Sequence, residues 1–269
     1  METIQAENLT PFEFRLLCRE QKHTGPTTNY CDNYVQANLV IMPQKYAEDF
    51  QNFCELNPKP CPLLEMTESG EVHANKFCQS GLDIRSDLPR YKVYRNGEFI
   101  EERLDIKDLW QNDFVCFLIG CSFSFESALQ QAGLSIRHIE EHKNVPMYKT
   151  NIPCKPAGIF HGNMVVSMRP FKPDQAQLAY EVTSNFPRVH GAPVYSGNDY
   201  FNALGISDIS KPDYGDSITI HEDEVPVFWA CGVTPQNVIT QAKEIPILIT
   251  HAPGHMLITD ILNDELKSQ

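Results

Sequence analysis

The chain has too few basic residues to suit a polyanionic partner. Of its 269 residues, 22 are Lys or Arg and 35 are Asp or Glu, so the formal net charge is −13. This balance repels phosphate backbones and anionic lipid, so we expect neither nucleic acid nor a membrane as a partner. A small anionic substrate would need a local site of positive charge that overcomes this repulsion.

Long apolar runs are also missing. The longest of them, such as Phe114–Ile119, are far shorter than the roughly 20 residues of a membrane-spanning helix. The first ten residues, METIQAENLT, have no basic region, no apolar core and no arginine, so no targeting segment is indicated. We therefore expect a cytoplasmic protein.

Several cofactor and metal motifs are absent. The nine cysteines are scattered and form no CxxC pair, which argues against a zinc ribbon or a thioredoxin motif. Reduced, buried thiols are the simpler interpretation. No P-loop is present and no GxGxxG follows a predicted strand, so nucleotide cofactors have little support. No cofactor is predicted with certainty.

Four segments repeat one pattern, in which an apolar strand is followed by Pro or Gly and then by a helix. The strands are expected at 38–42, 114–119, 164–168 and 227–233. Strands that alternate with helices favour an α/β protein with a mainly parallel sheet. Boundaries near 120–135 and 187–193 would divide the chain into a main α/β domain of residues 1–120 and 190–269 and a smaller inserted α+β domain of residues 121–189.

Two local signals are specific. Thr10, Pro11 and Glu13 form the pattern of a capping box, which predicts a helix to about Gln21. Residues 91–100 read YKVYRNGEFI, and Asn96-Gly97 in the middle predicts a hairpin with a tight turn.

The segment IPILITHAPGHMLITD (245–260) carries the most chemical information. A buried strand ends at Thr250, and His251 and His255 follow around Pro253-Gly254. Because Pro-Gly favours a turn over a helix, the two imidazoles need not form a helical zinc site. They are candidates for proton transfer, and Asp260 could orient a ring. The alternatives are a satisfied turn histidine, or a divalent metal bound by these three residues.

The segment GCSFSFE (120–126) joins a buried strand to a helix. Gly120, Cys121 and Ser122 lie at the helix start, where free backbone N–H groups attract an anion such as a carboxylate. Ser122 could equally be a helix cap. Glu126 is a candidate general base, although a first-turn acid also stabilises the helix dipole.

Three further residues are candidates for substrate binding. Arg169 follows an apolar strand, where its guanidinium could bind a carboxylate or close the strand end with an ion pair. Arg85 lies in DIRSDLPRY (83–91), in which a self-paired surface charge is the alternative. Thr234 precedes Pro235 and could cap a helix or contact a ligand.

Nearly the whole chain, from about Gln21 to Asp260, consists of segments with long and unusual motifs. They include DIRSDLPRYKVYRNGE (83–98), FLIGCSFSFESAL (117–129), NVPMYKTNIPCKPAGIFHG (144–162), VPVFWACGVTPQ (225–236) and THAPGHMLITD (250–260). Together these segments resemble the D-glutamate cyclase family, whose bacterial members go by the name of hydro-lyases. One departure is TNYCDNY (28–34), where the family tends to be rich in glycine and alanine.

The resemblance implies a three-layer αβα sandwich with a mixed, mainly parallel sheet and a smaller two-layer α+β domain. It implies a carbon–oxygen lyase that eliminates water from a small amino or hydroxy acid, with D-glutamate closing to 5-oxo-D-proline as the reference reaction. The reaction class carries over more securely than the substrate.

The closure of D-glutamate with loss of water requires a site that binds the carboxylate, a base that deprotonates the amine and an acid that protonates the leaving oxygen. We expect Arg169 or Arg85 to bind the carboxylate, His251 or His255 to act as the base, and the other histidine or Glu126 to act as the acid. A non-catalytic binding protein for small carboxylates is the alternative from another class. A homo-oligomer is left open.

Overall fold

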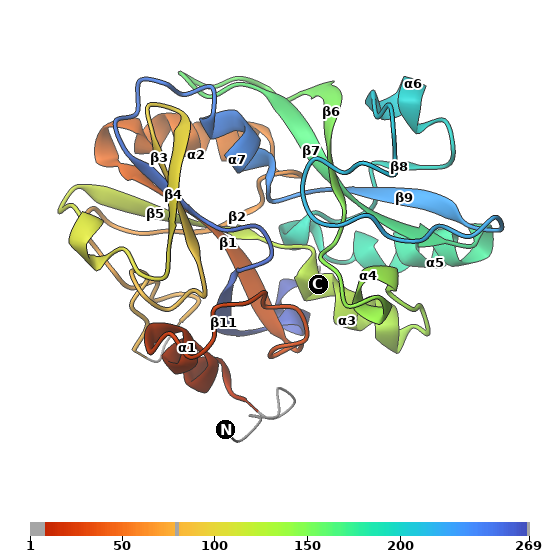
Figure 1. Ribbon diagram of the computed structural model, residues 1–269, viewed down its shortest axis with the longest axis horizontal. Helices are drawn as coiled ribbons and strands as arrows, with labels where there is room; N and C mark the ends of the chain where they lie inside the picture. The colour runs from red at the N-terminus through yellow and green to blue at the C-terminus, as the bar shows by residue number, and fades with distance from the viewer. Residues whose placement is uncertain (1–8, 79–80, 268–269) are drawn as a thin grey trace.

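The computed structural model describes residues 9–78 and 81–267 and arranges their strands in two sheets (Figure 1). A seven-stranded sheet has the order β2-β5-β1-β10-β3-β4, with β11 also paired to β1, and a four-stranded sheet has the order β6-β7-β9-β8. The strands are β1 (Tyr34–Pro43), β2 (Leu63–Met66), β3 (Tyr91–Arg95), β4 (Glu98–Arg103), β5 (Phe114–Gly120), β6 (Met147–Pro153), β7 (Asn163–Phe171), β8 (Tyr195–Ser196), β9 (Val225–Ala230), β10 (Leu248–His251) and β11 (Leu257–Leu262).

The prediction of a mainly parallel sheet is wrong. Each strand pairing found within the described residues is antiparallel. The apolar runs that favoured parallel strands are buried on both faces, as in β1, where only the first position is partly exposed. Burial of both faces is typical of parallel sheets, but an antiparallel sheet covered on both sides gives the same sequence pattern. The α/β composition itself is confirmed.

The local signals for helices and turns are confirmed. Thr10 and Glu13 form the capping box of α1 (Pro11–Arg19), and Asn96-Gly97, both with positive φ, join β3 to β4. The strand, turn and helix order is found at each of the four predicted units. The other helices are α2 (Ala47–Leu56), α3 (Phe123–Gln131), α4 (Arg137–Glu140), α5 (Pro173–Ser184), α6 (Tyr200–Leu204) and α7 (Thr234–Ile239).

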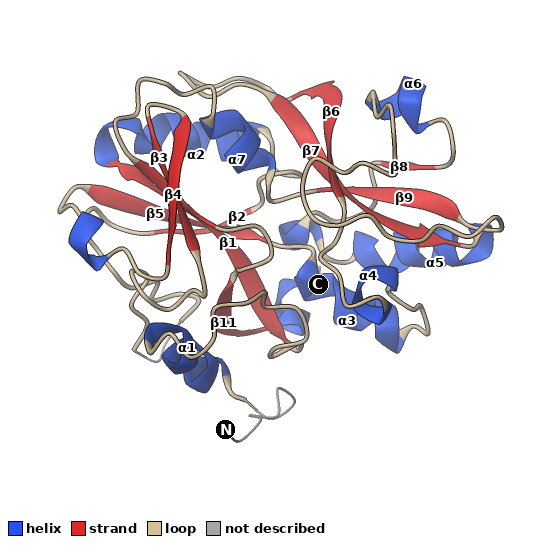
Figure 2. Cartoon of the chain, viewed as in Figure 1, coloured by secondary structure: helices blue, strands red, loops and turns tan. Residues whose placement is uncertain are grey.

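Helix α3 connects the two sheets. It packs against β1 of the seven-stranded sheet and against α5, which in turn covers β7 and β9 of the four-stranded sheet (Figure 2). One apolar core accordingly contains Leu39 from β1, Phe125 from α3 and Trp229 from β9. A residue on α3 can therefore contact groups from both sheets.

The four-stranded sheet is built from strands between residues 147 and 230, and the seven-stranded sheet from residues 34–120 and 248–262. The division into domains at residues 120 and 190 stays a prediction. Across residues 9–78 and 81–267, no helix has the length and apolar character needed to span a membrane.

Candidate active site

The strand β5 leads into the site and ends in a glycine. All seven residues of β5 are buried, and the strand ends at Gly120. A Cβ atom at this position would lie 2.2 Å from the backbone oxygen of Arg188, so only glycine lets the two segments approach this closely. The close contact at Gly120 is thus between two segments of the same chain.

The serines that follow Gly120 connect α3 to other elements. Ser122 makes no side-chain cap to α3, and its Oγ instead accepts a hydrogen bond of 3.1 Å from Nη2 of Arg169. Ser124 Oγ accepts the backbone N–H of Gln36 at 3.0 Å. These contacts fix the first turn of α3 against β7 and β1.

Glu126 and Arg169 form a buried ion pair at the centre of this arrangement. Arg169 Nε lies 3.0 Å from Glu126 Oε1, and Nη2 donates to the same oxygen. The guanidinium is fully buried and lies over the rings of Phe125 and Trp229, 5.4 and 5.5 Å from their centroids. Arg169 lies within β7 and not, as was expected, after the end of a strand, but it does form an ion pair, which was the alternative foreseen for it.

His138 on α4 is the third member of the cluster. Its Nε2 lies 3.3 Å from Glu126 Oε1, and both side chains are almost completely buried. The ring also stacks on Phe123, with centroids 6.3 Å apart. Glu126 Oε1 is thus approached by a guanidinium and an imidazole, while no described hydrogen bond or ion pair involves Oε2.

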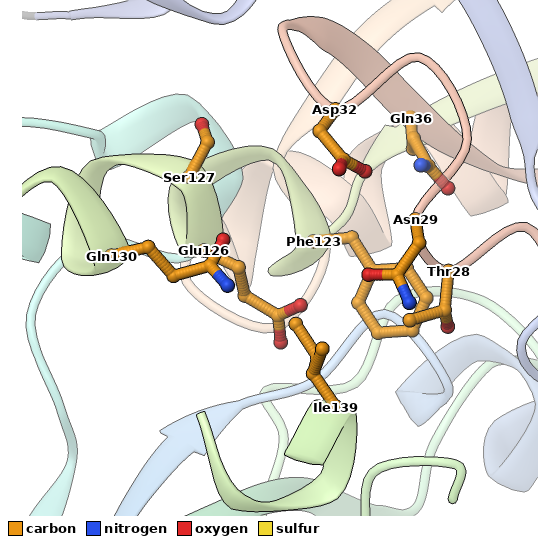
Figure 3. A pocket seen from close by; sticks show the side chains of 9 residues that line it. All are labelled: Thr28, Asn29, Asp32, Gln36, Phe123, Glu126, Ser127, Gln130 and Ile139. Atoms are coloured by element: carbon orange, nitrogen blue, oxygen red, sulfur yellow. The ribbon is translucent and has the colours of Figure 1, made fainter. Parts of the chain in front are cut away.

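A second carboxylate shares a pocket with Glu126. Figure 3 shows Asp32, from the loop before β1, and Glu126, from α3, among the residues that line this pocket. Burial opposes ionisation of Glu126, but the charges and hydrogen bonds of His138 and Arg169 outweigh it and lower its pKa to about 2. At Asp32, partial burial and then the charge of Glu126 raise the pKa. The two carboxyl groups are therefore shifted in opposite directions.

The pocket adjoins a larger hollow with a volume of about 380 Å³. The two share Thr28, Asn29 and Ile139. The walls of the hollow also include His23, Tyr30, His138, His142, Lys143 and Asn144. The hollow is large enough for a small amino or hydroxy acid.

The HAPGH segment forms a separate group beside this hollow. His251 ends β10 and is buried, and its Nδ1 accepts the N–H of Leu39 at 3.1 Å. Burial lowers the pKa of His251 to about 4. Burial also lowers the pKa of His255, whose Nδ1 lies 2.9 Å from the oxygen of Pro253.

Contacts through the turn connect this group to the hollow. Gly254 O accepts the N–H of Thr27 at 2.8 Å, and a Cβ atom on Gly254 would lie 2.8 Å from Asn144 Nδ2. For the part of the chain that is described, no hydrogen bond or ion pair joins His251 or His255 to Glu126 or Arg169. The predicted roles of both histidines stay predictions.

The other candidates have structural partners. Asp260 pairs with Arg15 at 2.8 Å, and Arg85 pairs with Asp83 at 2.8 Å. Thr234 Oγ1 accepts the N–H of Val165 at 3.0 Å and donates to Cys231 O at 2.7 Å. Cys121 is buried in an apolar cluster, and burial raises its pKa to about 12. No set of three His, Cys, Asp or Glu side chains arranged to hold a metal is found within the described ranges.

Three residues of the site were not predicted from the sequence. His138 lies in a stretch with little periodicity, and Gln36 lies inside a strand. Asp32 belongs to TNYCDNY, the segment that departs from the family pattern, and this was the one available signal. By contrast, Ser122, Glu126 and Arg169 were all candidates, and the structure brings them together.

A buried carboxylate held ionised beside a second carboxyl of raised pKa is typical of an acid–base enzyme. Comparison with known proteins agrees. The sequence model of D-glutamate cyclase matches residues 115–260. The chain belongs to the D-glutamate cyclase family.

Two relatives illustrate the extent of the match. A protein of Clostridium beijerinckii named "Putative hydro-lyase" is 53% identical over 96% of this chain and 97% of its own length. "Putative hydro-lyase GK2103" of Geobacillus kaustophilus is 54% identical over 94% of this chain and 95% of its own length. The predictions of the family, of an enzyme and of a hydro-lyase are thereby confirmed.

A search of solved structures gives a weak overlap. The crystal structure of a nitrogen repressor-like protein, MJ0159, from Methanococcus jannaschii covers 89% of this chain and 91% of its own, with 12% identity and a TM-score of 0.36. A likeness at this level carries no argument about fold or function.

Proposed function

We propose that this hydro-lyase removes water from a small amino or hydroxy acid, with the cyclisation of D-glutamate to 5-oxo-D-proline as the first reaction to test. The observation that carries the proposal is the pair Asp32 and Glu126, two carboxyl groups on one pocket with opposite pKa shifts. Groups whose environments separate their pKa values are suited to different roles in one reaction.

Glu126 supplies a fixed negative charge. Since its pKa is about 2, it stays ionised at neutral pH, and beside its ion pair with Arg169 it can still accept a hydrogen bond from the ammonium group of an amino acid. Arg169 and His138 are positioning residues, because both contact Glu126 Oε1 and neither makes a described contact with Oε2.

Asp32 carries the proton. A carboxyl group of raised pKa is a better base when ionised and gives up its proton more slowly than an ordinary aspartate. In our mechanism Asp32 takes a proton from the substrate ammonium, and the free amine attacks the γ-carboxyl carbon. The C–N bond forms, and Asp32 returns this first proton to one γ-carboxyl oxygen. Asp32 then takes a second proton from the newly bonded nitrogen and passes it to the same oxygen, so the C–O bond breaks and the oxygen leaves as water.

The assay is a substrate screen read by mass spectrometry. The purified chain is incubated with D-glutamate, L-glutamate, 5-oxoproline and small hydroxy acids, and the gain or loss of one water is measured. Asp32→Asn and Glu126→Gln should each lower kcat by roughly 100-fold or more. Asp113→Asn, the same charge change at an exposed site, is the control. A chain that converts none of these compounds would contradict the proposal.

The rival assignments are separated in the same assay. If His251 or His255 is the base, His251→Ala or His255→Ala lowers kcat while Asp32→Asn does not. If the chain is only a binding protein, the compounds bind and no water is released. A divalent metal at the site would make the rate fall with a chelator and recover with added metal.

A further inference from the structure

We propose that Thr27 is a positioning residue, which holds the loop of Asp32 against the HAPGH turn through a contact with Gly254. This inference rests on the proposed function, because it concerns the carboxyl group that carries the proton there. It gives the HAPGH segment a role in the site that needs neither imidazole to reach the substrate.

Thr27 and the turn are joined by three hydrogen bonds. The N–H of Thr27 donates to Gly254 O at 2.8 Å. Its Oγ1 donates to the same oxygen at 3.2 Å and accepts the N–H of Met256 at 3.3 Å. Thr27 is fully buried, so loss of its hydroxyl would leave buried polar groups without partners. The side chain thus connects two segments that lie 227 residues apart in the chain.

The turn itself is fixed to the seven-stranded sheet. It lies between β10 and β11, and the N–H of Ala252 donates to Arg90 O at 2.9 Å, immediately before β3. Within the turn, the N–H of His255 donates to Ala252 O at 2.9 Å. Gly254 has a φ of +81°, a conformation that glycine adopts readily and other residues rarely do. The oxygen that Thr27 contacts therefore belongs to a well-anchored segment.

The loop carries this attachment along the chain to Asp32. Gln36 Nε2 donates to the backbone oxygens of Thr27 and Tyr30, both at 3.2 Å. Asn263 Nδ2 donates to the backbone oxygen of Asp32 at 2.7 Å. The backbone of the loop is thus held at its first residue, in its middle and at its last residue, and a shift at Thr27 changes the path that leads to Asp32.

The carboxyl group of Asp32 depends on this backbone for its place in the pocket. Figure 3 shows Thr28, Asn29 and Asp32 on one loop at the pocket that Glu126 also lines. The described hydrogen bond of Asp32 is made by its backbone oxygen, and no hydrogen bond or ion pair to a described residue involves its carboxyl group. No neighbouring side chain therefore keeps the carboxyl group in position if the loop moves.

The loop also has a conformation that requires support. Asn29 and Cys31 have φ angles of +66° and +50°, in the left-handed region, which is unfavourable for residues with a side chain. Asparagine tolerates this region better than cysteine does. Contacts at the ends of the loop must offset this cost, so loss of the Thr27 hydroxyl should let the loop relax and move Asp32 away from Glu126.

The test removes the hydroxyl and keeps the shape of the side chain. Thr27→Val replaces Oγ1 by a methyl group, whereas Thr27→Ser retains the hydroxyl. Thr27→Ala takes the place of the valine variant if that variant does not fold, because it puts no methyl group beside Gly254 O. Thr150→Val is the matched control, since Thr150 is buried and its Oγ1 also donates to one backbone oxygen, of Met164 at 2.7 Å, and accepts one N–H, of Ile152 at 3.2 Å.

Two measurements follow Asp32 without any substrate. In carbon NMR titrations of labelled aspartate, assigned with Asp32→Asn, the pKa of Asp32 should fall toward its ordinary value in Thr27→Val, because the carboxyl group becomes less buried and moves away from Glu126. The backbone amides of residues 28–33 should exchange with solvent roughly 10-fold faster. Thr27→Ser and Thr150→Val should match the unmodified protein in both measurements.

Kinetic measurements connect the loop with the reaction. With D-glutamate, Thr27→Val should lower kcat by roughly 10-fold or more, and Thr27→Ser should stay within about threefold of the unmodified protein. The acidic limb of the kcat profile should shift to lower pH in Thr27→Val, since Asp32 then ionises more readily. A loss of stability alone would lower the amount of active protein and leave the pH profile unchanged.

The outcomes distinguish this inference from the proposed function. An Asp32 pKa and exchange rates that are the same in Thr27→Val as in the unmodified protein would overturn the inference, and so would equal effects of Thr27→Val and Thr150→Val. If no compound is converted but the pKa and the exchange rates change as expected, the positioning of Asp32 stands and the proposed reaction fails. If D-glutamate is converted and Thr27→Val keeps the full kcat, the reaction stands and the inference fails.

Discussion

Arg169 stabilises the fold by neutralising the buried charge of Glu126. It is fully buried and is paired with Glu126, Ser122 and Ser167. Such a pair contributes little compared with apolar residues of the same size, but the loss of one partner leaves an unpaired buried charge. Arg169→Leu should therefore lower the free energy of unfolding by about 3–5 kcal/mol in urea titrations. The double variant Arg169→Leu/Glu126→Leu should recover most of this loss, and equal instability of the two variants would contradict the argument.

His251 makes stability depend on pH. Burial lowers its pKa in the folded protein to about 4, whereas an unfolded histidine titrates near 6.5. Between these two pH values the unfolded chain binds more protons than the folded protein. The free energy of unfolding therefore falls as the pH drops from about 6.5 to 4, and the stabilising contribution of His251 is fully present above pH 6.5. The loss for one such histidine is at most about 3 kcal/mol.

The pH prediction is tested with variants. His251→Gln should flatten the pH dependence of urea unfolding between pH 7 and 4. It should do so only partly, because burial also lowers the pKa of His190 to about 4. The exposed His161→Gln serves as the control. An unchanged slope in both His251→Gln and the double variant with His190→Gln would refute the prediction.

Which residues form the site was predictable only in part. Ser122 and Glu126 follow the end of β5, and Arg169 follows an apolar run, and both features are visible in a sequence. In the structure, however, Arg169 lies within β7, which continues to Phe171. The partners His138 and Asp32 come from a four-residue helix and a loop, and their positions depend on how two sheets pack. Of the two interpretations of Arg169, a carboxylate ligand or an ion pair, the structure contains the ion pair with Glu126, and the binding of a substrate carboxylate stays a prediction.

At the scale of elements, β5 depends on a close contact at its last residue. A Cβ at Gly120 would meet the backbone oxygen of Arg188 at 2.2 Å, and backbone cannot move aside as a flexible side chain can. Gly120→Ala should therefore lower the free energy of unfolding by about 1–3 kcal/mol. Gly25→Ala is the matched control, because the nearest atom to its Cβ is 3.8 Å away, and its effect should stay within about 0.5 kcal/mol. Equal effects in chemical unfolding would contradict this account.

The strands β1, β3, β4, β5, β7, β9 and β10 were predicted, whereas β2, β6, β8, β11 and the direction of the strands were not. The apolar runs at β1, β5, β7 and β9, and the Asn96-Gly97 turn, are local features that the chain itself records. Direction depends on which strand becomes the neighbour. The helix after β1 leads to β2, which pairs with β5 and not with β1. Nothing local in the sequence specifies that pairing, so the parallel arrangement could not be excluded.

At the scale of the whole molecule, the net charge of −13 opposes the approach of an anion. An acidic amino acid with two carboxylates and one ammonium carries a net negative charge, and added salt screens its repulsion from the protein. For D-glutamate we therefore expect kcat/KM to rise by roughly two- to threefold between about 10 mM and 150 mM KCl. The rise should come mainly from a lower KM, because salt screens the approach of the substrate and not the proton transfers within the pocket. Choline chloride should give the same result, which excludes a specific effect of potassium. A kcat/KM that falls with salt would instead mean that Lys143 and the histidines around the hollow create an attractive local field that exceeds the charge of the whole protein.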